Sequence, residues 1–363
     1  VCSSDLAFRN FSIIVMLLAG VAFARGDDLQ KFVFEKAEMG VPFRITLFAE
    51  SEAKAKDAAE AGFARVEALN RIFSDYEDDT ELVKLSHTSG SGRAVKVSDD
   101  LWTVLSRAQL LAARTDGAFD VTCGPLTSMW RNARRKQELP SPERIAAMTA
   151  RVGWKKMRLD EKSHTVELLA PDMRLDVGSI GKGYAADEAL KVLRAKGCPS
   201  AMVAGSGDIS AGDPPPGRKG WRIEVVGLDL DDAAAAPPPV VIEIANAAIA
   251  TSGDRTQRLD ANGKRYSHIL DPRTGQPLTD HGDRALAIGV NEGDAAAGGG
   301  VPPGHVQLQP KGFEALRRFG AAAVTAEGGE ERHPLAGEPR HLHRHHRAAS
   351  RGMVVKVAGV ADL

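Results

Sequence analysis

The sequence predicts an α+β protein with mixed sheets and packed helices, followed by an atypical C-terminal tail. The 363 residues are 43% hydrophobic, which suits one large or two ordinary globular domains. Residues 31–48 alternate as a strand pair with its turn at Met39-Gly40, and residues 52–72 carry apolar side chains at helical spacing. A strand pair followed directly by an amphipathic helix is typical of the start of an α+β domain.

Residues 1–24 form the predicted leader. Arg9 precedes an apolar run that ends in Ala22-Phe23-Ala24, a small-x-small pattern typical of a signal-peptide cleavage site. We therefore expect the chain to be exported, with an uncleaved membrane anchor as the alternative. The functional domain is expected over residues 25–281.

Charge and cysteine content narrow the class of protein. The formal net charge is −1, and the central region has no basic stripe interleaved with aromatic residues, so we expect no nucleic-acid partner. Cys123 and Cys198 are too few for a disulfide framework in a chain of this length. We expect two unbridged thiols, with a single bridge as the alternative.

Two helices are predicted next along the chain. Residues 99–115 form the first, capped by Ser98, and residues 140–152 form the second, entered through Ser141-Pro142. Both have a side-chain oxygen where a helix N-terminus needs an acceptor.

Strands and a third helix follow. We expect strands at residues 154–169 and 173–177, a helix over residues 184–196 and a strand over residues 201–203. This order is βαβ-like, and its second strand carries Asp176. Further strands are expected at residues 221–226 and 240–244.

A glycine-rich loop separates Asp176 from the predicted helix. We expect Gly178, Gly181 and Gly183 to permit positive φ and close backbone approach, with the helix N–H groups facing the loop. Because Lys182 adds positive charge, the segment predicts a site for a phosphate-bearing ligand. The spacing matches neither a Walker A loop nor the dinucleotide-binding fingerprint, and a tight turn without a ligand is the alternative.

Other segments place polar side chains at turns. Tyr76 lies among carboxylates, Asp120 lies between two turn glycines, and Asp208 follows a small-residue turn. Asp254 and His268 belong to two later segments of the same kind. Each alone is typical of capping at a turn. Together they predict one nucleotide site, in which Tyr76 stacks on a ring and a divalent cation binds the phosphates.

His268 has two interpretations. It is a candidate general acid/base or phosphate contact, and the alternative is a capping or packing role beside a turn.

The composition changes near His281. From there the chain is rich in Gly, Ala, Pro, Arg and Glu and holds seven of the ten histidines. These histidines are scattered among arginines, without the acid partners and fixed spacing of a metal site. Residues 282–363 are therefore expected to be a disordered or frameshifted tail, with residues 313–319 as a candidate helix.

The ordered motifs resemble the FAD:protein FMN transferases of the ApbE family over residues 31–280. The motifs are Met39-Gly40, Ser74-x-Tyr76-x4-Glu81, Gly117-Ala-Phe-Asp120-x3-Gly124-Pro125, Asp176-x2-Ser179-x-Gly181-Lys182-Gly183-Tyr184-Ala185-x-Asp187, Gly205-x-Gly207-Asp208, Ser252-Gly253 and Ser267-His268-x2-Asp271-Pro272-x-Thr274-Gly275. The resemblance implies an ApbE-like α+β fold and display in the periplasm or on the periplasmic face of the inner membrane. It also implies a Mg²⁺-dependent reaction that splits the pyrophosphate of FAD. FMN is attached through a phosphodiester to a Thr or Ser hydroxyl of an acceptor protein, and AMP leaves.

The resemblance assigns site residues as well. The implied FAD contacts are Met39, Tyr76, Ala118, Phe119, Asp120, Asp176, Lys182 and Ile269. The main-chain oxygen of Ser179 would bind the metal. The family pattern also places an Asp and a following Thr downstream, whose side chains complete the metal site. In residues 287–300 only Asp294 is a candidate for this Asp, and no Thr follows it at the expected distance. Asp208, Asp254 and His268 are candidates for the base that activates the acceptor hydroxyl.

The departure of residues 287–300 from the family pattern leaves two alternative functions. One is a Mg²⁺-dependent FAD pyrophosphatase, in which water replaces the acceptor hydroxyl. The other is a non-catalytic FAD-binding protein.

Overall fold

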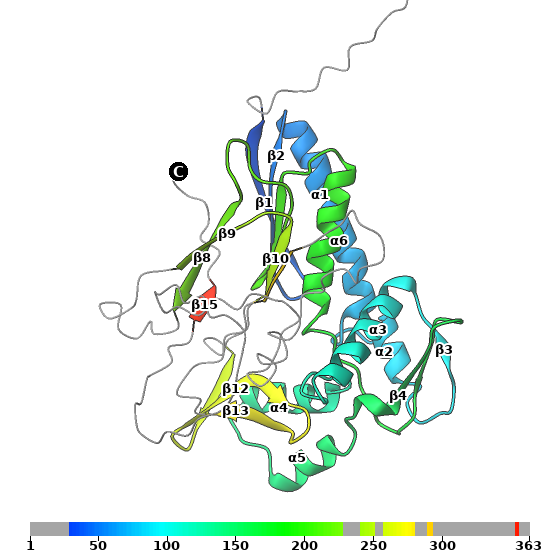
Figure 1. Cartoon of the computed structure of the whole chain (residues 1–363). Helices are drawn as coiled ribbons and strands as arrows, with labels where there is room; N and C mark the ends of the chain where they lie inside the picture. Colours follow the sequence, from blue (N-terminus) through cyan, green and yellow to red (C-terminus); the bar gives the residue numbers. More distant parts are fainter. Residues whose placement is uncertain (1–28, 228–239, 251–256, 280–288, 293–352, 356–363) are drawn as a thin grey trace, which may run out of the picture.

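The computed structural model describes residues 29–227, 240–250, 257–279, 289–292 and 353–355 (Figure 1). The predicted leader, Asp254, Asp294 and the candidate helix at residues 313–319 lie outside these ranges. Within the described ranges, no helix is both long enough and apolar enough to cross a membrane.

A six-stranded sheet forms the upper part of the molecule. Its spatial order is β1 (Gln30–Glu38), β2 (Val41–Ala49), β6 (Ala201–Gly205), β7 (Asp208–Ala211), β10 (Ala247–Ala250) and β14 (Gly289–Glu292). Each neighbouring pair is antiparallel. Met39 and Gly40 both have positive φ, as a two-residue hairpin turn between twisted strands requires. β14 lies within the predicted tail range and pairs with β10.

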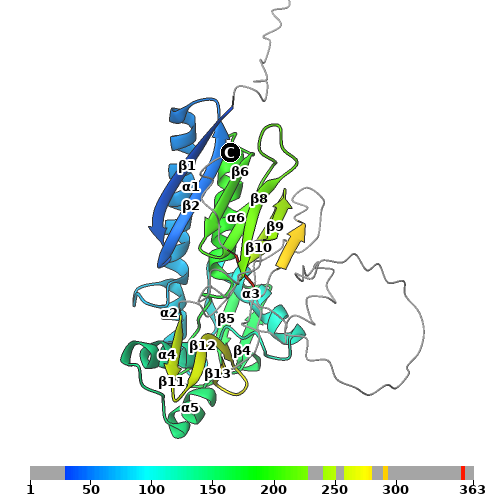
Figure 2. The same ribbon diagram turned by 90° about the vertical axis from the view of Figure 1, so that its left-hand side faces the viewer.

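Two long helices cover one face of this sheet. α1 (Glu52–Phe73) and α6 (Gly181–Ala195) run side by side along it in Figures 1 and 2. α1 begins where the Ser51 hydroxyl accepts from the Lys54 N–H. The two helices approach closely because Gly62 has no side chain. A Cβ there would lie 3.0 Å from Ile45 and 3.4 Å from Leu193.

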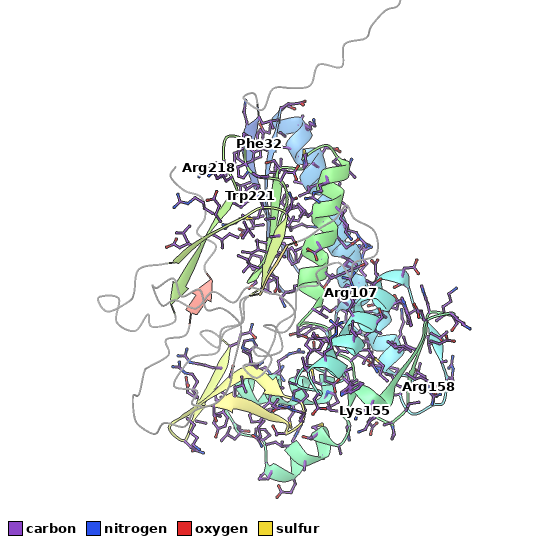
Figure 3. The ribbon with its side chains drawn as sticks, viewed as in Figure 1. Phe32, Arg107, Lys155, Arg158, Arg218 and Trp221 are labelled. Atoms are coloured by element: carbon purple, nitrogen blue, oxygen red, sulfur yellow. The ribbon has the colours of Figure 1, made fainter. Side chains whose placement is uncertain are left out.

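A smaller sheet lies against the opposite face. It has the order β15 (Met353–Val355), β8 (Trp221–Gly227) and β9 (Val240–Ile244). Trp221, labelled in Figure 3, packs on Phe48 of β2 with ring centroids 5.9 Å apart. Ile209 and Ile249 of the main sheet join Trp221 in one buried cluster. The main sheet is therefore covered on both faces.

The lower part of the molecule is built from short elements. A three-stranded sheet there has the order β3 (Val95–Lys96), β5 (Thr165–Leu168) and β4 (Met157–Asp160). The 3-10 turn η2 (Trp154–Lys156) leads directly into β4. The helices α2 (Glu81–Ser86) and α3 (Asp99–Arg114) lie near this sheet. α4 (Gly124–Lys136) contacts α5 (Pro142–Thr149) and the sheet β11 (Arg258–Ala261), β12 (Lys264–Asp271) and β13 (Gln276–Thr279).

The structure confirms the predicted fold class and most predicted elements. These are the strand pair β1–β2, helices α1, α3 and α5, and strands β6, β8 and β9. The predicted caps are also present, because Ser98 accepts from the Leu101 N–H and Ser141 from the Arg144 N–H. The predicted long strand at residues 154–169 is instead η2 followed by the hairpin β4–β5.

The predicted strand at residues 173–177 is wrong, and with it the βαβ-like order. The segment makes a single isolated bridge, between Arg174 and Cys123. Two amides of the segment have non-strand partners: the Leu175 N–H donates to the Ser86 hydroxyl, and the Asp176 N–H donates to the Val121 carbonyl. These two N–H groups therefore have acceptors without a neighbouring strand.

Candidate functional site

The loop from Asp176 to Lys182 is closed by its own side chains. Asp176 Oδ1 accepts from the Gly178 N–H at 2.8 Å, and Lys182 Nζ donates to the Gly178 carbonyl at 2.7 Å. These two bonds hold a tight turn at the N-terminus of α6, where the Gly181 N–H donates to the Val177 carbonyl at 2.7 Å. A helix N-terminus favours an anion through its dipole and the N–H groups of its first turn.

The predicted backbone of the three glycines is wrong. None of Gly178, Gly181 and Gly183 has a positive φ. α6 begins at Gly181, three residues before the predicted start, so Gly181 and Gly183 have helical backbone. The site is therefore a helix N-terminus preceded by an Asp-stabilised turn.

Three predicted residues come together at this end of the main sheet. Asp208 begins β7 and is buried, and its Oδ2 lies 3.8 Å from Lys182 Nζ. Met39 lies at the β1–β2 turn, with its Cε 3.8 Å from where a Gly181 Cβ would be. The β6–β7 turn is tied to β2, because Ser206 N–H donates to the Pro42 carbonyl at 3.4 Å. Met39, Lys182 and Asp208 thus surround the start of α6.

Helix α4 supplies two site residues that the sequence analysis missed. Thr127 Oγ1 donates to Asp176 Oδ2 at 2.7 Å, and Arg131 Nη2 lies 3.5 Å from the same oxygen. Their spacing of four residues puts both on one helix face. The signal was present in the sequence: Pro125 in the first turn and three basic residues in the last turn are typical of a helix.

Arg131 also connects two neighbouring residues of the site. Its Nη1 donates to Asp75 Oδ2 at 3.0 Å, and its guanidinium carbon lies 4.2 Å from the centroid of the Tyr76 ring. Asp75 is buried, whereas Tyr76 is 72% exposed. The predicted ring-stacking residue is therefore supported by a cation on one face and has a large exposed surface.

Burial and the nearby carboxylates raise the pKa values of two groups at the site, Asp75 and Cys123. Burial and the negative charge of Asp176 raise the pKa of Asp75, although Arg131 opposes this shift. Burial, together with the charges of Asp176 and Asp120, raises the pKa of the Cys123 thiol well above its ordinary value. Cys123 is therefore a protonated thiol and a poor nucleophile. Neither Cys123 nor Cys198 forms a disulfide, as predicted.

The segment from Ala118 to Asp120 lies next to Asp176 through the backbone of Val121. Ala118 and Phe119 are buried, and Phe119 belongs to the main core. The Asp120 carboxylate accepts from the Thr122 N–H, the Thr122 hydroxyl and the Trp154 N–H, at 2.7 to 2.8 Å. In this structure the Asp120 side chain therefore organises its own turn.

His268 and Ile269 lie on β12, in the sheet that packs on α4. The His268 N–H donates to the Gln257 carbonyl, and the Ile269 N–H donates to the Ser267 hydroxyl. Trp130 joins this sheet to α4, because its indole N–H donates to the Gly275 carbonyl at 2.8 Å. α4 thus lies between the sheet of His268 and the loop of Asp176.

The described residues do not form a metal centre by themselves. No three His, Cys, Asp or Glu side chains gather in a group that could hold an ion in the part of the chain that the structure describes. Ser179 lies in the turn before α6, and the other predicted ligand, Asp294, lies outside the described ranges.

The antiparallel sheet and the helix pair that covers one of its faces define a mixed α/β protein. A sequence model of the ApbE family matches residues 39–297, and the chain belongs to this family. The chain is 28% identical to the FAD:protein FMN transferase of Chlamydia muridarum, over 73% of this chain and 81% of that protein. It is also 28% identical to the enzyme of the same name from Escherichia coli K12, over 88% and 93%.

Solved structures agree with this membership. Flavin transferase ApbE from Vibrio cholerae superposes with a TM-score of 0.64 at 28% identity, covering 73% of this chain and 82% of that chain. The ApbE protein of Thermotoga maritima superposes with a TM-score of 0.63 at 27% identity, covering 72% and 82%. The predicted ApbE-like fold is thereby confirmed.

Proposed function

We propose that this chain is an exported FAD:protein FMN transferase, which moves FMN from FAD to a Thr or Ser hydroxyl of an acceptor protein and releases AMP. Its family membership and the names of its relatives support the transferase activity. The observation that carries the proposal is the convergence of Asp176, Lys182 and Asp208 at the N-terminus of α6.

The described residues fit the chemistry of FAD. The N–H groups at the start of α6 and the Lys182 ammonium provide donors for a pyrophosphate. The exposed ring of Tyr76 provides a stacking surface, and Asp176 provides carboxylate oxygens for ring or ribose donors. Met39 adds an apolar contact beside the helix start.

The transfer is a displacement at the phosphorus atom of the FMN half. The acceptor oxygen forms the new P–O bond, and the P–O bond to the AMP half breaks. The hydroxyl proton passes to a base, and AMP leaves with the bridging oxygen. Among the candidate bases, Asp208 lies beside the Lys182 ammonium and at the phosphate end of the proposed site.

The proposal includes a requirement for Mg²⁺. A divalent ion on the pyrophosphate would neutralise the charge that develops on the phosphoryl oxygens. The main-chain oxygen of Ser179 and the Asp294 carboxylate are the proposed protein ligands. The periplasm, or the periplasmic face of the inner membrane, is the proposed location, and the predicted leader supports it.

One reaction tests the function. The chain is incubated with FAD, Mg²⁺ and a flavin-acceptor domain, and covalent flavin fluorescence on the acceptor is followed together with AMP and FMN. Labelled acceptor plus AMP is expected, and chelation by EDTA should abolish both. FMN plus AMP without label would instead identify a pyrophosphatase. Intact bound FAD would identify a binding protein.

A matched pair of variants tests the base. Asp208→Asn keeps the size of the side chain and removes its basicity, so we expect label to form at least about tenfold more slowly. His268→Gln tests the alternative base in the same assay. Transfer at the wild-type rate in His268→Gln would exclude a catalytic role for His268, and the same result in Asp208→Asn would exclude Asp208.

A further inference from the structure

Arg131 occupies the centre of the candidate site without belonging to any motif that the sequence analysis used. From α4 it reaches the Asp75 carboxylate at 3.0 Å, the Asp176 carboxylate at 3.5 Å and the Tyr76 ring at 4.2 Å. The side chain of Arg131 is 33% exposed, and those of Asp75 and Asp176 are 9% and 12% exposed. One guanidinium therefore joins three residues from two separate segments, Asp75-Tyr76 and the loop of Asp176.

We propose that Arg131 is a positioning residue for FAD, which holds the Tyr76 ring by one face so that the other face stacks on a planar ring of the dinucleotide. The proposal rests on the proposed function, because FAD is the ligand that it concerns. Arg131 also contacts Oδ2 of the Asp176 carboxylate. The other oxygen, Oδ1, accepts from the Gly178 N–H and so closes the loop from Asp176 to Lys182. A single side chain thus sets the relative position of the ring contact and the loop.

The exposure of Tyr76 argues against a purely structural role. A ring as exposed as that of Tyr76, at 72%, adds little apolar burial to the fold, and the Arg131 guanidinium lies over one of its faces. Cation–π contact immobilises an aromatic ring before a ligand arrives, which lowers the ordering cost of binding.

The other partners of Asp75 and Asp176 also support a positioning role for Arg131. Asp75 has a second cationic neighbour, because Arg174 Nη2 donates to the Asp75 main-chain carbonyl at 2.5 Å. Asp176 keeps its bonds from Thr127 and Gly178 independently of Arg131. Arg131 is thus not the sole hydrogen-bond partner of the Asp176 carboxylate, whereas it is the stacking partner of Tyr76.

The test measures equilibrium binding of FAD, riboflavin and AMP to the full chain carrying Arg131→Lys. Lysine keeps the charge but has no planar group to stack on the ring. We expect the Kd for FAD to rise about threefold to thirtyfold, with a loss for one of the two fragments and no loss for the other. Arg135→Met, an exposed position on the same helix, is the control for α4 charge and should bind as wild type.

A double-mutant cycle with Tyr76→Ala separates positioning from folding. Because Tyr76 is exposed, this variant should fold and should lose affinity for the same fragment as Arg131→Lys. If Arg131 acts through Tyr76, adding Arg131→Lys to Tyr76→Ala should weaken FAD binding by less than twofold more. For Arg131→Lys, we expect the KM for FAD to rise by a larger factor than kcat falls, because a positioning residue acts mainly on binding.

The outcomes distinguish this inference from the proposed function. Wild-type flavin transfer with unchanged FAD affinity in Arg131→Lys would overturn the inference alone. A loss that falls equally on riboflavin and AMP, or full additivity in the cycle, would also overturn it. If the wild-type chain bound none of the three ligands, the proposed function and the inference would fail together.

Discussion

Two regions of the molecule place an arginine between two carboxylates and a tyrosine. In the first, Arg65 of α1 binds Asp100 through two nitrogens, at 2.5 and 2.8 Å, and Glu188 at 2.7 Å. Tyr184 completes this group, because its hydroxyl donates to Asp100 at 2.7 Å. We call these four residues the helix cluster, since they join α1, α3 and α6.

The second region is the group formed by Asp75, Tyr76, Arg131 and Asp176, which we call the loop cluster. Its ion pairs are longer, at 3.0 and 3.5 Å, and its tyrosine ring lies under the guanidinium with the hydroxyl outside the ion pairs. Tyr76 is 72% exposed, whereas Tyr184 of the helix cluster is 8% exposed. The same residue types therefore form a closed group in one place and an open group in the other.

The fold shifts the pKa values of one aspartate in each cluster in opposite directions. Burial alone would raise the pKa of Asp100, but hydrogen bonds from Arg65 and Tyr184 outweigh it and lower the pKa. Burial and the charge of Asp176 raise the pKa of Asp75. Each cluster holds two carboxylates and one arginine, but Asp100 accepts hydrogen bonds from both Arg65 and Tyr184, whereas Asp75 is buried beside a second carboxylate. This difference is what separates a structural ion cluster from a candidate binding site.

The largest expected effect is on the helix cluster. Arg65→Met leaves Asp100 and Glu188 close together without their cation, so we expect a loss of about 3 kcal/mol in the free energy of unfolding. Urea unfolding measures this loss. FAD binding by the folded fraction should be unchanged, and a weakened affinity there would contradict the separation of the two clusters.

The next effect concerns the packing of α4 beneath the loop cluster. A Cβ on Gly124 would lie 2.5 Å from the Arg174 carbonyl oxygen, so Gly124→Ala should push α4 away and cost about 2 kcal/mol. FAD affinity should fall as well, because Thr127 and Arg131 move with the helix. Gly181→Ala is the matched control, since its Cβ would meet other atoms only at 3.6 Å or more. Equal stability of Gly124→Ala and wild type would contradict this account.

The smallest expected effect is on the pH dependence of stability. Because the pKa of Asp100 is lowered, its contribution is present above the ordinary aspartate pKa of 3.8 and is lost as pH falls through the folded-state pKa. The pKa of Asp75 is raised, so its contribution is present below 3.8 and is lost as pH rises through the folded-state pKa.

Unfolding free energies across this pH range test both signs. The advantage of wild type over Asp100→Asn should shrink as the pH falls below 3.8. The stability of wild type relative to Asp75→Asn should instead increase as the pH falls toward 3.8. Parallel pH profiles for the two variants would show that the clusters do not differ in charge compensation.

Local signals explain which elements were predictable. α1, α3 and α5 each begin at a serine whose hydroxyl accepts from the first turn, and the sequence predicts all three. α2, α4 and the true start of α6 were missed. α4 and α6 begin without a side-chain cap, whereas α2 is a short helix that does begin at one, Thr80. Tertiary contacts fix α4 instead, such as the bond from Trp130 to Gly275, 145 residues away.

The candidate site divides in the same way. Asp176 and Tyr76 lie in turns, and Lys182 lies in a glycine-rich segment at the start of α6, so local sequence patterns pointed to all three. Thr127 and Arg131 reach Asp176 and Asp75 across 49 and 56 residues, and no local pattern reports such contacts. The strand predicted at residues 173–177 failed for a related reason, because a strand needs a neighbouring strand that the local sequence does not specify.

The loop cluster, and not the helix cluster, is the proposed FAD site. The most direct measurement compares FAD binding and thermal unfolding of Arg131→Lys and Arg65→Lys under identical conditions. We predict that Arg131→Lys raises the Kd for FAD about threefold to thirtyfold with little change in Tm. Arg65→Lys should lower Tm and leave the Kd unchanged. A wild-type Kd in Arg131→Lys, or an equal rise in both variants, would contradict the account.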